Sequence, residues 1–170
     1  MIILGIDPGY AIVGYCAIEF MKGRYRAVGY GAIFTDAGEV FSSRLQLIYD
    51  QMTIILKKCQ PDAFSIEKLY FQNNQKTAIG VAEARGVILL AASKAGVPIY
   101  EYTPLQIKTA VTGYGQAEKK QVMEMTKRLL HLKEVPKPDD TADALAIAIC
   151  HANAAGSQLR MKLMQGGQKR

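Results

Sequence analysis

Cysteine is scarce in this chain of 170 residues, and the three cysteines lie far apart, at Cys16, Cys59 and Cys150. No two of them have the C-x-x-C spacing of a structural zinc site, and their odd number argues against a disulfide framework. A chain of this kind fits a reducing compartment. The sequence therefore predicts a protein that depends on its hydrophobic core for stability.

Long hydrophobic runs are also missing. The longest apolar run is about residues 87–92, with Arg85 before it and Lys94 after it, whereas a helix that spans a bilayer needs about 20 apolar residues. The chain also starts directly on an apolar segment at residues 2–5, without the basic stretch that opens a signal peptide. We expect a cytoplasmic protein with no membrane segment.

The charge is unevenly distributed. The chain has a net charge of +6, of which residues 156–170 carry +4 without a single acidic residue. A basic surface suits a polyanionic partner such as nucleic acid, although it also favours solubility. We expect one domain over residues 1–155, followed by a basic, disordered tail at residues 156–170.

The order of predicted elements indicates an α/β fold. Runs of branched and aromatic residues between turn signals predict strands at residues 2–7, 12–20, 25–35, 63–67 and 98–102. Helical periodicity, with Ser42 or Ser43 as the first cap, predicts helices at residues 42–59, 74–95, 104–112, 117–132 and 139–154. Three strands in a meander followed by alternating helices and strands favour a mixed sheet of about five strands with helices on both faces.

Carboxylates stand at three places where an apolar core would not favour them. Asp7 ends the first predicted strand, Glu67 ends the fourth, and Asp140 and Asp143 lie in the first turn of the last predicted helix. Ligands of α/β sheets gather beyond the carboxyl ends of the strands. If the first and fourth strands are parallel neighbours, Asp7 and Glu67 lie close together.

Carboxylates gathered in one place repel one another, and a divalent cation such as Mg²⁺ removes the conflict. Two such ions about 3.5–4 Å apart form the usual site for phosphodiester hydrolysis. Each group also has a simpler explanation: Asp7 as a turn residue before Pro8 and Gly9, Glu67 as a solvated strand end, and Asp140 with Asp143 as a capping box. The metal-site hypothesis depends on all of them occurring together.

Several segments resemble one family, the RuvC crossover-junction endonucleases. In chain order they are residues 5–9 (GIDPG) with Gly14 and Tyr15, residues 65–67 (SIE), residues 83–87 (EARGV), residues 117–122 (AEKKQV) and residues 140–148 (DTADALAIA). The first segment alone also opens actin-like ATPases, but the five together span nearly the whole chain. The chain departs from the usual family pattern at Tyr10, Cys16, Ala17 and Thr141.

The resemblance implies a ribonuclease H-like fold and a homodimer that binds four-way DNA junctions and nicks two opposing strands symmetrically. It implies Mg²⁺ as the cofactor, with Mn²⁺ as a substitute, and a branch-migration helicase complex of the RuvA and RuvB type as a partner. The implied metal ligands and catalytic carboxylates are Asp7, Glu67, Asp140 and Asp143. The implied basic residues near the scissile phosphate are Lys108 and Lys119, and the implied DNA contacts are Tyr70, Lys108, Lys119 and Lys120.

Some interpretations stay open at this point. The helix at residues 74–95 is apolar around much of its circumference, so its large side chains serve the core, a partner subunit or both: Ile79, Val81, Val87, Ile88, Leu89 and Leu90. A related RNA-processing nuclease and an inactive junction-binding module are the alternative functions, while an actin-like ATPase would need a second lobe. The two histidines, His131 and His151, are interpreted as structural.

Overall fold

Five strands form one mixed sheet in the computed structural model of the protein, which describes residues 1–69 and 75–166. Their order across the sheet is β3-β2-β1-β4-β5. The first three are antiparallel neighbours, as a meander requires, whereas β4 is parallel to both β1 and β5. The predicted mixed sheet is confirmed.

The strands are β1 (Ile2–Asp7), β2 (Ile12–Met21), β3 (Arg24–Phe34), β4 (Ala63–Glu67) and β5 (Ile99–Tyr102). The helices are α1 (Phe41–Cys59), α2 (Gln75–Lys94), α3 (Pro104–Thr112), α4 (Lys119–Leu129) and α5 (Asp139–Gly166). None of the helices in the part of the chain that the structure describes is long and apolar enough to cross a membrane.

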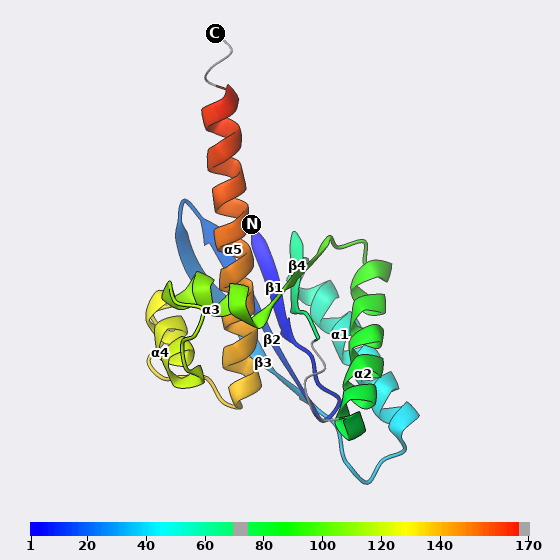
Figure 1. The fold of residues 1–170 in the computed structure, drawn as a ribbon. Coiled ribbons are helices and arrows are strands. Elements are labelled where there is room, and N and C mark those ends of the chain that lie inside the picture. The colour runs from blue at the N-terminus through cyan, green and yellow to red at the C-terminus, as the bar shows by residue number, and fades with distance from the viewer. Residues whose placement is uncertain (70–74, 167–170) are drawn as a thin grey trace.

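Helices cover both faces of the sheet, α1 and α2 on one side and α3, α4 and α5 on the other (Figure 1). Each face has its own hydrophobic core. Side chains of a strand alternate between faces, so Leu4 and Ile6 of β1 pack in the core with α1 and α2. Ile3 packs in the core with α5. The same alternation turns Asp7 toward α5.

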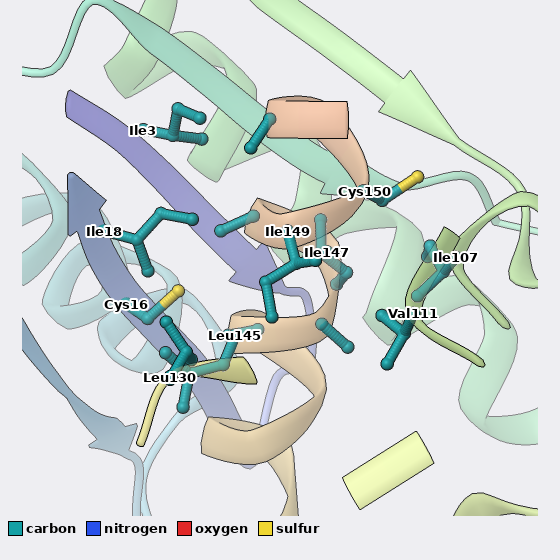
Figure 2. Packing of buried hydrophobic residues seen from close by; sticks show 14 of the residues in the cluster. Ile3, Cys16, Ile18, Ile107, Val111, Leu130, Leu145, Ile147, Ile149 and Cys150 are labelled. Atoms are coloured by element: carbon teal, nitrogen blue, oxygen red, sulfur yellow. The ribbon is translucent and has the colours of Figure 1, made fainter. Parts of the chain in front are cut away.

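Helix α5 lies unusually close to β1 and β2. A Cβ atom on Gly5 would stand 2.3 Å from the backbone oxygen of Ala144, and one on Gly14 would stand 2.0 Å from that of Asp140. Isoleucines of the strands and of α5 fill the space on either side of this contact (Figure 2). Small residues on both sides allow this close contact, which holds the first turn of α5 at the end of β1 and near the start of β2.

Two predicted boundaries are wrong. Helix α1 begins at Phe41 after Val40, which makes no side-chain cap, so neither Ser42 nor Ser43 is the cap. Helix α5 continues to Gly166, well beyond residue 154. The segment expected to be a disordered tail is therefore helical over residues 156–166, because it is rich in good helix formers such as Gln, Leu, Met, Lys and Arg and has no proline.

Candidate active site

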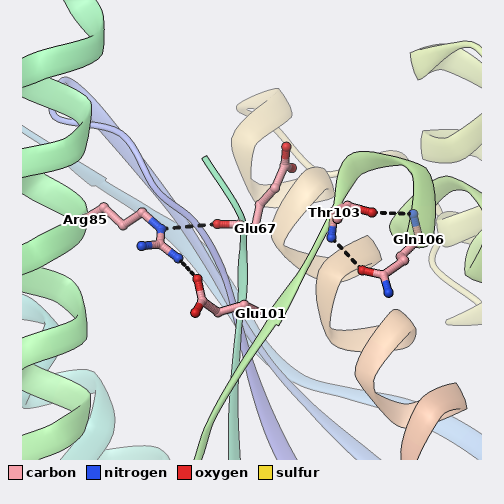
Figure 3. Close-up of polar contacts among 5 residues, drawn as sticks. All are labelled: Glu67, Arg85, Glu101, Thr103 and Gln106. Atoms are coloured by element: carbon pink, nitrogen blue, oxygen red, sulfur yellow. Dashed lines mark hydrogen bonds and ion pairs between the residues drawn. The ribbon is translucent and has the colours of Figure 1, made fainter. Parts of the chain in front are cut away.

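Asp7 and Glu67 end two strands that lie side by side. Strands β1 and β4 are parallel, with Ile6 opposite Ile66, so the next residue on each strand is a carboxylate at the same edge of the sheet. Ile66 packs with α1 and α2, and the alternation of the strand turns Glu67 to the opposite face, toward α5 (Figure 3). The condition set from the sequence, that these strands be parallel neighbours, is met.

The first turn of α5 brings the other two carboxylates. The helix begins at Asp139, one residue before Asp140, so Asp140 does not stand at the N-cap and the capping-box interpretation of Asp140 with Asp143 is wrong. Instead, Oδ2 of Asp143 lies 2.8 Å from Nζ of Lys119. The side chains of Asp140 and Asp143 are both partly buried, and both lie close enough to Asp7 for their charges to raise its pKa.

These carboxylates disfavour one another's charge. Burial, followed by the charges of Asp143, Glu67 and Asp140, raises the pKa of Asp7 to about 8. Burial and the charge of Asp143 also raise the pKa of Glu67. Burial raises the pKa of Asp143, against the opposing effect of Lys119. Repulsion of this kind is the cost of gathering several acids in one place, and it is relieved by positive charge.

Two lysines supply part of that positive charge. Lys108 lies on α3, whose first turn is closed by a capping box of Thr103 and Gln106 (Figure 3). Lys119 is the first residue of α4. The charges of both lysines lower the pKa of Glu67, and both line one pocket with Glu67 and Asp143. The structure therefore places these two predicted basic residues beside the carboxylates.

Two other predicted DNA contacts are not placed there. Lys120 is exposed and lines a different pocket on α4, with Glu124 and Arg128. Tyr70 lies outside the described residues. The two histidines lie apart from the carboxylates: His151 is buried, with its Nδ1 atom 2.8 Å from the hydroxyl of Tyr102, and His131 lies just beyond the end of α4.

The donor set fits a divalent cation in its chemistry. Carboxylate oxygens are the hard ligands that Mg²⁺ prefers, and a cation would relieve the repulsion that, together with burial, raises the pKa of Asp7. Across residues 1–69 and 75–166, however, no three histidine, cysteine, aspartate or glutamate side chains are arranged so that they could hold a metal ion. The ammonium of Lys119 lies against Asp143 and partly neutralises its charge.

Sequence reasoning missed one residue next to the site. Arg85 of α2 donates a hydrogen bond from Nε to the backbone oxygen of Glu67, at 3.3 Å, and forms an ion pair with Glu101 (Figure 3). It was noticed only as part of the segment at residues 83–87. The signal available in the sequence was a charged residue next to the apolar side of a predicted helix, since Ala84 and Ile88 are apolar and the structure buries both.

Comparison with known proteins identifies the family. The model of the family described as "Crossover junction endodeoxyribonuclease RuvC" matches residues 3–151. The chain belongs to this family. The RuvC protein of Brevibacillus brevis is 59% identical over 152 residues, which cover 89% of this chain and 92% of that protein.

Solved structures agree with this assignment. The structure of Thermus thermophilus RuvC has a TM-score of 0.87 at 36% identity, and covers 93% of this chain and 97% of its own. That of T. thermophilus RuvC in complex with Holliday junction substrate has a TM-score of 0.85 at 33% identity, with 92% and 96% covered. The predicted ribonuclease H-like fold, the family and the endodeoxyribonuclease class are confirmed.

Proposed function

We propose that this protein resolves Holliday junctions in DNA recombination and repair, by Mg²⁺-dependent hydrolysis of one phosphodiester in each of two opposing strands. The observation that carries the proposal is the group of four carboxylates that β1, β4 and α5 bring together, with Asp7 held at a raised pKa of about 8. A related RuvC structure contains a Holliday junction. Its likeness to this chain over nearly the full length supports the same substrate here.

Once their side chains turn toward a shared ion, Asp7, Glu67, Asp140 and Asp143 would hold the metal, with Mn²⁺ as a substitute for Mg²⁺. When bound, such ions activate the attacking water and stabilise the leaving oxygen. Lys108 and Lys119 would offset negative charge as it develops on the phosphate. Lys119 is suited to this role because its side chain is 56% exposed while its ammonium remains in contact with Asp143.

Further DNA contacts are proposed from the resemblance. Tyr70 follows β4 by three residues and would stack on a junction base, a contact worth about 1–3 kcal/mol. Lys120 would contact a phosphate. A branch-migration helicase complex of the RuvA and RuvB type would deliver the junction, in the cytoplasm, where the DNA of bacteria such as the source of the related protein lies.

A homodimer fits two symmetric cuts, because two sites related by a two-fold axis match a pseudo-symmetric junction. The outer face of α2 is the proposed contact. Ile88 is buried in the core, whereas Ile79 and Leu90 are 68% and 53% exposed. Gly86 lies on the same exposed face, and nothing lies within 4 Å of a Cβ added to it.

The first test is cleavage of a mobile synthetic four-way junction beside a linear duplex and an RNA hairpin, with Mg²⁺ and with chelator. Paired nicks in opposing strands of the junction alone, only with Mg²⁺, are expected. Cleavage of the RNA instead would indicate a processing nuclease. Junction binding without any cut would indicate an inactive binding module.

A pair of neighbouring variants tests the site itself. Asp140→Asn should bind the junction and not cut it, since it removes a proposed ligand. Asp139→Asn should lose much less cleavage than Asp140→Asn, because Asp139 is about half exposed, bonds Lys137 at 2.8 Å and lies 3.9 Å from Nζ of Lys119, farther than Asp143 does. Equal loss in both variants would mean that α5 needs negative charge in its first turn, not a ligand at residue 140.

A further inference from the structure

The end of β4 is held from both faces of the sheet. The carboxylate of Glu67 points to α5, and its backbone oxygen is contacted from the side of α2 (Figure 3). The donor is Nε of Arg85, at 3.3 Å. The same guanidinium forms an ion pair with the carboxylate of Glu101 on β5, so one side chain joins α2, β4 and β5.

The surroundings of Arg85 hold its side chain in place for this contact. The Arg85 side chain is only 15% exposed, although arginine is usually solvated. Glu101 stands opposite Ile66 in the register of β4 and β5, one residue before the last pair of these two strands. A guanidinium has several donors in a rigid fork, so it can serve a carboxylate and a carbonyl at once.

The neighbouring strand explains why an outside donor is useful. Glu67 is the last residue of β4, and the partner strand β1 ends at Asp7. The next residue along β1 is Pro8, which has no N–H to continue the ladder. An unpaired carbonyl costs about 1–3 kcal/mol when it is shielded from water. Arg85 supplies the missing donor at the point where the strand turns into the site.

We propose that Arg85 is a positioning residue, which fixes the backbone of Glu67 so that its carboxylate stays directed at Asp7 and Asp143. Arg85 acts through Glu67 rather than on the substrate. Groups that orient metal ligands in this way typically account for about 10–100-fold in metal affinity or activity. The inference rests on the proposed role of Glu67 as a metal ligand.

The test compares Arg85→Gln, Arg85→Lys and Glu101→Gln in the full-length protein. Cleavage of pre-bound junction is followed across a series of Mg²⁺ concentrations, and the rise in melting temperature caused by Mg²⁺ is measured without DNA. Arg85→Gln should need about 10-fold more Mg²⁺ for half-maximal cleavage and show a smaller melting shift. Arg85→Lys, which keeps the positive charge but not the planar fork of donors, should lie between wild type and Arg85→Gln.

A matched control is Arg26→Gln. Arg26 also bonds a glutamate, with Nη2 lying 2.8 Å from Oε2 of Glu19, but on the outer hairpin of β2 and β3. It should leave the Mg²⁺ requirement unchanged. If Arg85→Gln does not fold, Glu101→Gln and Arg85→Lys carry the test, and both should still shift the Mg²⁺ requirement upward.

A wild-type Mg²⁺ requirement in the folded Arg85 variants would overturn the inference. So would weaker junction binding, measured with chelator present, at an unchanged Mg²⁺ requirement, because that result would make Arg85 a DNA contact. Loss of the dimer at an unchanged Mg²⁺ requirement would make it an interface residue and would overturn the inference equally. If wild-type cleavage does not depend on Mg²⁺ at all, the proposed function fails first, and the two failures are distinguishable.

Discussion

Asp7 shows why this site needs a cation. Its side chain is largely shielded from water and faces three other carboxylates, so its pKa rises to about 8 from an ordinary value of 3.8. In the absence of metal the folded protein therefore binds a proton that the unfolded chain releases. The free energy of unfolding should then fall as the pH rises between about 4 and 8.

Asp7→Asn removes this dependence. Without metal and above pH 8, the variant should be more stable than wild type by up to roughly 6 kcal/mol, because no buried charge has to form. Added Mg²⁺ should stabilise wild type much more than the variant. Urea unfolding at pH 5, 7 and 9, with chelator and with Mg²⁺, measures both effects. Asp50→Asn, at an exposed position of α1, is the control, and an identical pH profile for Asp7→Asn and wild type would contradict the prediction.

Lys119 differs from its neighbour Lys120 in what it faces. Lys119 contacts Asp143, whereas Lys120 lies with Glu124 and Arg128. Lys119→Ala should slow cleavage of bound junction by about 10-fold or more, through lost stabilisation of charge on the phosphate. Lys120→Ala should cost less in the same single-turnover measurement. Equal losses would mean that both lysines act only through general attraction to DNA.

At this scale the sequence, with the family resemblance, predicts which carboxylates and lysines lie together, but not the contact of Arg85. Asp7 and Glu67 end strands that are otherwise mostly apolar, so each stands out from the hydrophobic pattern of its strand. Arg85 does not stand out in this way, because an arginine on a helix usually lies on the solvent-exposed face. Only the approach of α2 to the end of β4 shows that its guanidinium serves a backbone oxygen.

Among the elements, α5 has the strictest packing requirement. Its first turn carries Asp140 and Asp143, and its position depends on contacts at Gly5 and Gly14 that leave no room for a side chain. A methyl group at either glycine must push the helix outward. Metal geometry and helix packing are therefore coupled through the backbone of β1 and β2.

Gly5→Ala tests this coupling. The new methyl would meet the oxygen of Ala144 at 2.3 Å, so we expect a loss of roughly 1–3 kcal/mol in the free energy of unfolding and slower cleavage. Gly29→Ala is the matched control on β3, where nothing lies within 4 Å of an added Cβ. Urea unfolding and junction cleavage measure both variants. Equal stability of the two would show that α5 accommodates the methyl without cost.

Element ends were harder to predict than element types. The capping box of Thr103 and Gln106 fixes the start of α3 locally, and that start was predicted correctly. The start of α1 was not, because Val40 offers no side-chain cap and the helix there depends on tertiary packing. The end of α5 was also missed, since the basic segment after residue 155 was expected to be disordered whereas its residues favour a helix.

Over the whole molecule, the order of the strands in the sheet brings the residues of the site together. Asp7 and Glu67 are 60 residues apart in the chain, and they meet only because β4 is placed beside β1 rather than at the edge next to β3. Alternation of strands and helices predicts the fold class, but several strand orders would satisfy that pattern. Periodicity does not choose among these strand orders, whereas the resemblance to a known family implies one fold, the ribonuclease H-like fold.

The proposed dimer is the last feature at this scale. Ile79 and Ile54 are both well exposed, at 68% and 55%, but Ile79 lies on α2 and Ile54 on α1. If the outer face of α2 is the contact, Ile79→Asp should replace an apolar contact by a second charge one turn from Glu83 and shift the protein toward monomer, whereas Ile54→Asp should not. Analytical ultracentrifugation measures this directly. The monomeric variant should also give single rather than paired nicks, because the second site no longer reaches the opposing strand. If both variants remain dimers that cut in pairs, the contact lies on another face, and the two-fold axis has to be sought there.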